Sequence, residues 1–261
     1  MGPQSSVETM TRCAVGAERL GFESLWITDH IAIPPDDAEG SGGRYLDTLT
    51  TLAYLGGVTR TIRLGSGVII LPYRPPLPTA KQVATVQELT GGRLLLGVGI
   101  GWMDAEFRAL GVDRHQRGRI SDETLDYLNR CFTEEVMEAN GQPFLFRPCP
   151  DKPPVYVGGS APHALLRAAR YGDGWLPMAL EPDPLGEAMV EYRRITEELD
   201  RPAGQVTLMR GLPLGKPDAT RALLEQYQGL GLDRLVCALG YDDADAYLHQ
   251  LEQLAELIDS K

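Results

Sequence analysis

Two kinds of apolar pattern alternate along the chain. Short runs of consecutive apolar residues are typical of buried strands, and segments in which apolar residues recur every three or four positions are typical of helices. The runs predict strands at 25–28, 62–71, 94–100, 155–157, 175–178, 206–214 and 235–239. The periodic segments predict helices at 7–20, 47–58, 78–89, 104–110, 121–139, 163–171, 184–199, 220–228 and 243–258. Because helical segments separate the strands, we expect an α/β fold with a parallel sheet covered by helices.

The predicted order of elements begins with a helix. A (β/α)8 TIM barrel begins with a strand, so the seven predicted strands fall one short of a complete barrel. We therefore expect either that the first strand lies upstream of this numbering, or that it was lost and other elements cover its gap. The length of 261 residues fits one large barrel domain over residues 1–261.

Composition narrows the class of protein further. Apolar residues make up 43% of the chain, but no run of 18 apolar residues indicates a membrane span, and no signal peptide is visible. The net charge of −11 argues against nucleic-acid binding. The four cysteines are scattered without a CxxC pair, which favours reduced thiols and a cytoplasmic protein. No residue spacing typical of a metal site is present.

One segment joins a predicted strand to a predicted helix through two glycines. Gly158 and Gly159 allow a sharp turn and the close approach of another molecule. Ser160 is a good N-cap, and Pro162 suits the first helical turn. Free backbone N–H groups at a helix start favour a phosphate group. The alternative is an ordinary strand–loop–helix joint, and the local pattern favours neither interpretation.

A second segment carries candidate catalytic residues. Asp29 and His30 follow a predicted strand and precede a loop, rich in Pro, Gly and Asp, at residues 31–45. Long loops in compact domains are usually functional and often act as lids. Histidine exchanges a proton near neutral pH, and a neighbouring carboxylate can fix its tautomer. The alternative is a strand-end cap that binds the next loop.

Four segments together resemble the bacterial luciferase-like monooxygenase family, specifically its branch of deazaflavin (coenzyme F420)-dependent oxidoreductases. They are GFESLWITDH (21–30), IRLGSGVIILP (62–72), GRLLLGVGIGW (92–102) and PPVYVGGSAPHALLRAARYGDGW (153–175). The resemblance covers nearly the whole chain. It implies a luciferase-like TIM barrel, usually dimeric, with a flavin or deazaflavin at the C-terminal ends of the strands and hydride transfer to or from a small organic substrate.

The resemblance also implies roles for individual residues. In related enzymes the histidine that matches His30 lies near the reactive ring, and the aspartate that matches Asp29 helps to hold the cofactor. Ser66, Gly67 and Val68 match a bulge with a non-prolyl cis peptide behind the ring. For these three residues the alternative is close packing of barrel strands.

Further implied contacts lie on two later strand ends. Gly99 stands where a strand end borders the cofactor in the family. Trp102 occupies the place of an acidic residue in the sugar-phosphate dehydrogenase relatives, so a sugar phosphate is not expected. Trp102 either lines an apolar pocket or belongs to the core. The residues that match the phosphate-holding turn are Gly158, Gly159 and Ser160.

Three other functions remain open. FMN also offers one phosphate, so the chain is alternatively an FMN-dependent monooxygenase that uses oxygen. A non-catalytic flavin-binding barrel needs no lid, and the loop at 31–45 argues against it. A cofactor-free hydrolase or aldolase would need a strand-end lysine or paired carboxylates, and the sequence shows neither. The expected partners are a small-molecule substrate and a second copy of the chain, paired through the helices at 47–58 and 78–89, without nucleic acid or membrane.

Overall fold

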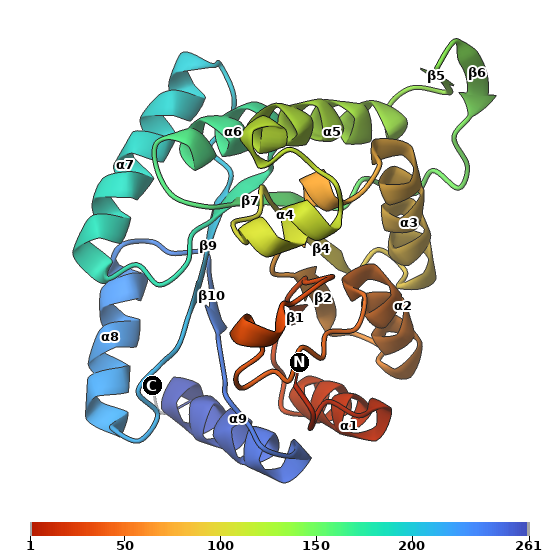
Figure 1. The fold of residues 1–261 in the computed structure, drawn as a ribbon. Helices are drawn as coiled ribbons and strands as arrows, with labels where there is room; N and C mark the ends of the chain where they lie inside the picture. The colour runs from red at the N-terminus through yellow and green to blue at the C-terminus, as the bar shows by residue number, and fades with distance from the viewer. Residues whose placement is uncertain (1, 260–261) are drawn as a thin grey trace. The chain divides into compact units, whose positions relative to one another are not determined.

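The computed structural model describes residues 2–259 of the chain, which Figure 1 traces from red to blue. The chain forms two compact units. Of the described residues, the first unit contains 2–3 and 26–155, and the second contains 4–25 and 156–259. Each unit therefore consists of one short segment and one long segment of the chain.

In the first unit, parallel strands are followed by helices. The strands are β1 (Ser24–Ile27, of which Trp26 and Ile27 belong to this unit), β2 (Arg63–Ser66), β3 (Ile69–Ile70) and β4 (Leu94–Gly99). The helices are α2 (Thr48–Val58), α3 (Pro76–Leu89), α4 (Asp104–Ala109) and α5 (Arg117–Cys131). Both β2 and β3 pair with β4 in parallel. The loops that follow these strands therefore leave from one edge of the sheet, where ligands bind in such folds.

The second unit has the same kind of arrangement. Its strands are β7 (Val155–Gly158, of which 156–158 belong to this unit), β8 (Gly174–Leu176), β9 (Gln205–Arg210) and β10 (Arg234–Cys237), and they pair in this order and in parallel. Its helices are α1 (Val7–Arg19), α6 (His163–Tyr171), α7 (Pro182–Glu198), α8 (Pro217–Gly229) and α9 (Ala244–Asp259). Figure 1 shows the red α1 beside the dark-blue α9, and the two helices are in contact.

The predicted order of strands and helices is confirmed for the described residues. The strand predicted at 62–71 is present as two pieces, β2 and β3, so the parallel strands occupy the seven predicted positions. Two predicted caps are also present. The Ser6 side chain accepts a hydrogen bond from the N–H of Thr9 at 3.1 Å. The Asp47 side chain accepts one from the N–H of Thr50 at 2.9 Å.

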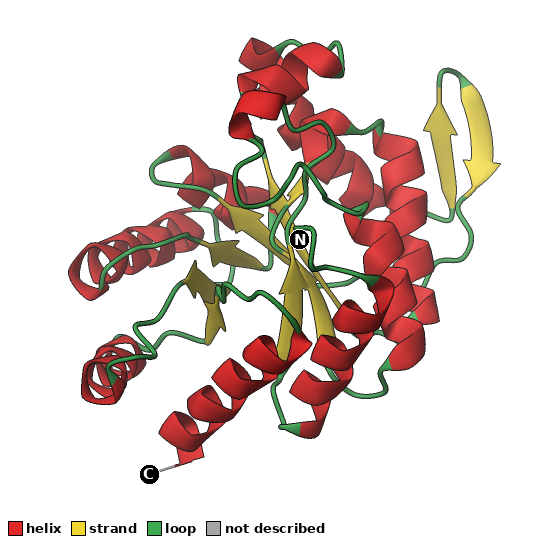
Figure 2. Ribbon diagram, turned by 60° about the horizontal axis from the view of Figure 1, so that its bottom comes forward, coloured by secondary structure: helices red, strands yellow, loops and turns green. Residues whose placement is uncertain are grey.

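The helix predicted at 121–139 is wrong over its second half. Helix α5 ends at Cys131, and an antiparallel hairpin follows, made of β5 (Val136–Ala139) and β6 (Gln142–Leu145). Asn140 and Gly141 join the two strands with φ values of 52° and 75°. Two consecutive residues with positive φ are typical of a tight hairpin turn, and Asn-Gly is its strongest sequence signal. Figures 1 and 2 show the hairpin extending away from α3 and α5 of the same unit.

The core of the first unit lies between the strands and the helices α2 and α3. These helices contact β2, β4 and each other. The side chains of Leu52, Leu64, Val83 and Leu94 are completely buried there. Within residues 2–259, no helix is both long and apolar enough to cross a membrane.

Candidate active site

The candidate catalytic residues stand where β1 ends. After Ile27 the chain continues through Thr28, Asp29 and His30 without regular structure. It then enters the loop 31–45, whose one regular piece is a short 3-10 turn at Pro35–Asp37. The predicted loop is therefore confirmed, and His30 stands at its entrance.

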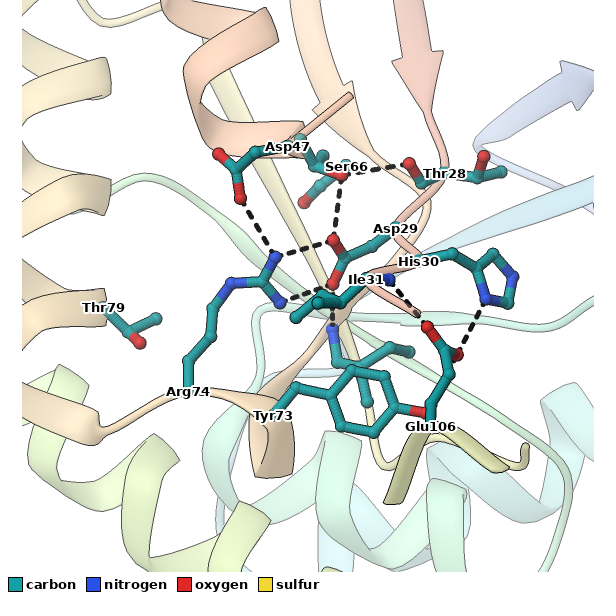
Figure 3. Close-up of polar contacts among 12 residues, drawn as sticks. Thr28, Asp29, His30, Ile31, Asp47, Ser66, Tyr73, Arg74, Thr79 and Glu106 are labelled. Atoms are coloured by element: carbon teal, nitrogen blue, oxygen red, sulfur yellow. Dashed lines mark hydrogen bonds and ion pairs between the residues drawn. The ribbon is translucent and has the colours of Figure 1, made fainter. Parts of the chain in front are cut away.

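Asp29 lies in a closed network of hydrogen bonds (Figure 3). It is 3% exposed. Arg74 donates to both of its carboxylate oxygens, at 2.6 and 2.8 Å. The N–H of Ile70 and the hydroxyl of Thr48 donate to the same two oxygens at 2.9 and 3.1 Å. Arg74 also reaches Asp47, the N-cap of α2, at 3.2 Å. Asp29 thus fixes the end of β1 against β3 and α2.

The ion pairs around Arg74 hold its charge in place. Burial by itself disfavours the charged guanidinium, but hydrogen bonds and charge pairing with Asp29 and Asp47 outweigh burial and raise the pKa of Arg74. The side chain of Arg74 keeps only 10% of its surface exposed. Its charge is therefore neutralised inside the protein rather than offered to a ligand.

The carboxylate that contacts His30 comes from α4 and not, as the sequence predicts, from the neighbouring residue. The Nδ1 atom of His30 lies 2.8 Å from Oε2 of Glu106, a side chain that is 1% exposed (Figure 3). The N–H groups of Ile31 and Ala32 donate to its Oε1 at 2.6 and 3.0 Å. The hydroxyl of Tyr73 donates to Oε2 at 3.1 Å. Burial, and next the charge of Glu106, raise the pKa of Tyr73, which keeps this hydroxyl protonated.

These donors determine which nitrogen of His30 carries the proton. Burial raises the pKa of Glu106, but the N–H groups of Ala32 and Ile31, together with His30, outweigh burial and lower it below its usual value. An ionised carboxylate only accepts hydrogen bonds, so Nδ1 donates the proton. In neutral His30 the lone pair is then on Nε2, which forms no hydrogen bond within residues 2–259. The side chain is 19% exposed, so Nε2 can exchange a proton with a bound molecule.

Two aromatic rings flank His30. The ring of Tyr45 is 4.7 Å away between centroids and tilted by 58°. The ring of Trp102 is 6.4 Å away, edge-on at 85°. Trp102 is 66% exposed, so the interpretation of Trp102 as a core residue is wrong. Its role in lining an apolar pocket stays a hypothesis.

Of the geometry expected at residues 66–68, the non-prolyl cis peptide is confirmed. The peptide between Gly67 and Val68 is cis. Ser66 is buried and donates its hydroxyl hydrogen to the carbonyl of Gly97 at 2.8 Å, which ties β2 to β4. At Gly99 a Cβ atom would lie 2.6 Å from Cγ2 of Val68, so this glycine is needed for packing. Val68 is half-buried and leaves part of its side chain open to a ligand.

The predicted phosphate turn lies in the second unit, directly after β7. Gly158 is buried, and Gly159 is exposed with a φ of 123°, which favours glycine. The prediction that Ser160 caps the helix is wrong. The chain makes a further turn at 161–162, and α6 has Pro162 as its N-cap, without a side-chain hydrogen bond. The indole of Trp175 donates to the carbonyl of Gly159 at 2.9 Å, so Trp175 supports the turn. Phosphate binding here stays a prediction.

Sequence reasoning missed Tyr73, Arg74 and Glu106. Tyr73 and Arg74 had a usable signal, because polar groups directly after a predicted parallel strand gather at the ligand-binding edge. Glu106 had only a weak one, a single carboxylate beside Phe107 in a short helix. Within residues 2–259, no group of three or more His, Cys, Asp or Glu side chains is placed to hold a metal ion.

Comparison of the whole chain with known proteins defines its family. The family of luciferase-like monooxygenases matches residues 1–256. An uncharacterised protein of Mycobacterium tuberculosis is 34% identical over 203 residues, which cover 71% of this chain and 70% of that protein. A 5,10-methylenetetrahydromethanopterin reductase of Archaeoglobus fulgidus is 30% identical over 171 residues, which cover 64% of this chain and 48% of the reductase.

Solved structures show the same fold. The monooxygenase RslO1 from Streptomyces bottropensis matches with a TM-score of 0.82 at 18% identity, over 99% of this chain and 95% of that one. The oxygenating constituent of 3,6-diketocamphane monooxygenase from Pseudomonas putida, in complex with FMN, matches with a TM-score of 0.80 at 15% identity, over 100% and 95%. The predicted α/β luciferase-like TIM-barrel fold is thus confirmed. The chain belongs to the luciferase-like monooxygenase family of flavin- or F420-dependent oxidoreductases.

Proposed function

We propose that the protein is an oxidoreductase that transfers a hydride between coenzyme F420 and a small organic molecule. The observation that carries the proposal is His30, held by the buried Glu106 at 2.8 Å and left with an unpaired Nε2. Hydride transfer to a polar bond leaves a charge that a proton must neutralise, and a positioned histidine supplies or removes that proton. The similarity to an archaeal reductase supports the reductive direction.

The residues of the first unit fit a flavin-like ring. A half-buried Val68 follows the cis peptide bond on the strand end, and Gly99 leaves room for its side chain. When bound, the coenzyme supplies the hydride chemistry. The chain supplies the apolar surface of Val68 behind the ring and the proton exchanged at Nε2 of His30. The carboxylate of Asp29 is bound by Arg74, so Asp29 acts by holding the strand end.

The turn after β7 is the proposed binding site for the phosphate group of the cofactor. Gly158, Gly159 and Ser160 are proposed to bind the phosphate group through backbone N–H groups. Gly159 and Ser160 are exposed, as a phosphate contact requires. Since the helix starts later than predicted, this proposal rests on the turn itself and less on the helix dipole.

FMN is the alternative cofactor, with oxygen as co-substrate. It is supported by the FMN in the 3,6-diketocamphane monooxygenase structure, which shares the fold. A non-catalytic flavin-binding barrel is less well supported, because it has no need of a buried Glu106 that orders His30 and the entrance to the loop 31–45.

A direct titration separates these functions. The purified protein is incubated with coenzyme F420 and with FMN, and binding is followed by absorbance and isothermal titration. We expect micromolar or tighter binding of F420 and weaker binding of FMN. Tighter binding of FMN overturns the assignment in favour of the monooxygenase. Failure of both to bind favours a barrel without a cofactor.

A further inference from the structure

Two aromatic rings flank His30, and one of them is largely exposed. Trp102 is 66% exposed, which is unusual for a large apolar side chain next to a buried ion pair. Tyr45 lies on His30 with ring centroids 4.7 Å apart. We call Tyr45 and Trp102 the aromatic patch. Exposed apolar side chains that gather around a polar group are typical of a binding site.

The charges near this patch do not suit an anion. Arg74 is neutralised by Asp29 and Asp47. Arg114 forms an ion pair with Asp104 at 2.9 Å, in the helix that follows Trp102.

The loop that carries Ile31 and Tyr45 adds negative charge. It contains three carboxylates, those of Asp36, Asp37 and Glu39, against the single guanidinium of Arg44. An anionic substrate therefore meets a loop with a net negative charge, which disfavours its approach.

We propose that the aromatic patch binds the substrate, and that the substrate is a neutral, flat, unsaturated molecule, such as an aromatic ketone or the corresponding alcohol. This inference rests on the proposed function, because His30 is the group that must meet the reacting oxygen. The indole of Trp102 and the phenol of Tyr45 offer faces and edges that a flat π-system contacts well. The Nε2 atom of His30 is the hydrogen-bonding group for the oxygen of the substrate.

The reaction is the two-electron reduction of a ketone to an alcohol. If the reduced coenzyme were bound, it would supply a hydride to the carbonyl carbon as the C=O π bond breaks, and Nε2 of protonated His30 would give one proton to the oxygen. The ketone is reduced to an alcohol and the coenzyme is oxidised. In the reverse direction the neutral His30 accepts the proton.

Three probes of similar size test the substrate class without the coenzyme. Acetophenone is neutral and flat, benzoate is flat and anionic, and cyclohexyl methyl ketone is neutral and not flat. Binding is measured by saturation-transfer difference NMR. We expect acetophenone to bind tightest, and Trp102→Ala to weaken it about fivefold, the size of one aromatic contact. The matched control is Leu89→Ala, which shortens an equally exposed side chain on α3 (65% exposed) and is expected to change nothing.

Each other outcome overturns a part of the inference. Tighter binding of benzoate overturns the neutral charge, and equal binding of cyclohexyl methyl ketone overturns the flat shape. An unchanged affinity in Trp102→Ala, or an equal loss in Leu89→Ala, overturns the location. Loss of acetophenone binding when F420 or FMN is added assigns the patch to the cofactor ring instead. The three probes are measured without coenzyme. A negative result with them is therefore distinct from a negative result in the coenzyme titration, which tests the proposed function.

Discussion

The hydrogen-bond partner of His30 is not the carboxylate next to it in the sequence. Asp29 and His30 are adjacent in an extended segment, and successive side chains of an extended chain point to opposite sides. Asp29 therefore points to Arg74, and His30 meets Glu106, which lies 76 residues later. The prediction that the neighbouring carboxylate fixes the histidine is wrong, because the carboxylate at His30 is that of Glu106. Its identity depends on how α4 packs, which no local pattern contains.

Replacement of His30 by alanine tests the proton transfer. We expect His30→Ala to lower turnover about tenfold or more, since positioned proton transfer contributes at least that much. The cofactor affinity is expected to change less, because the proposed role of the His30 side chain is proton exchange with the substrate and not binding of the cofactor. Steady-state rates at saturating cofactor provide the measurement. His115→Ala, on an exposed 3-10 turn, is the matched control. Unchanged turnover in His30→Ala removes this residue from the mechanism.

Glu106 makes the stability of the fold depend on pH. Its pKa is lower in the folded protein than in the unfolded chain, because the N–H groups of Ala32 and Ile31, together with His30, outweigh burial. Its ionised form therefore stabilises the fold fully above the unfolded pKa of about 4.3, and this contribution is lost as the pH falls through the folded pKa. We expect Glu106→Gln to lower the free energy of unfolding by about 2 kcal/mol at pH 7.

The difference between the wild type and Glu106→Gln is expected to shrink as the pH falls below about 4. Urea unfolding at pH 7, 5 and 3.5 measures it. Glu123→Gln is the control, because Glu123 forms an exposed ion pair with Arg119 on α5, and such pairs contribute little. A constant difference across this pH range shows that the charge of Glu106 does not stabilise the fold.

At the scale of single elements, local signals predicted the starts of α1 and α2 and failed where two structures compete. Helix α1 starts after Ser6, as predicted, because a serine at that place satisfies a free N–H group. The residues at 136–139 are tolerated in both helix and strand, so the pattern of 121–131 predicts a helix that continues over them. The Asn140–Gly141 turn was the deciding signal for the hairpin.

Glycine within β2 is required by one neighbouring ring. A Cβ atom at Gly65 would lie 2.2 Å from Cδ2 of Trp26 on β1, closer than side chains approach. We expect Gly65→Ala to displace the indole and to lower the free energy of unfolding by about 1–3 kcal/mol. Chemical denaturation followed by tryptophan fluorescence measures both effects. Gly229→Ala, at the end of α8 with nothing within 4 Å, is the control and is expected to be close to neutral. Equal stabilities of the two variants would contradict close packing at Gly65.

At the scale of the whole molecule, the family and the fold were predictable because four segments occur in a fixed order, and the assembly remains a proposal. Helix α2 carries no charged residue over Thr48–Val58, although Thr50, Tyr54 and Gly57 are exposed. An uncharged exposed helix face favours contact with a second copy. We propose a homodimer and expect Tyr54→Asp to dissociate it at micromolar concentration in light scattering.

Val190→Asp is the control for the assembly. This residue is 66% exposed on α7 and is expected to leave the dimer intact. A wild-type protein that scatters as a monomer at micromolar concentration would contradict the homodimer.

Binding of the cofactor phosphate at the turn after β7 depends both on the backbone conformation of Gly159 and on the charge at position 160, and separate variants test the two. Gly159 has a φ of 123°, so Gly159→Leu strains the backbone as well as occupying the expected phosphate position. We expect it to abolish the binding of both F420 and FMN. Ser160→Glu adds a negative charge at an exposed position next to it, and is expected to weaken both cofactors about tenfold or more by repulsion. Ser160→Gln, of the same size and uncharged, is expected to bind nearly as the wild type. If Ser160→Glu and Ser160→Gln bind F420 equally in isothermal titration, with unchanged melting temperatures, the phosphate lies elsewhere.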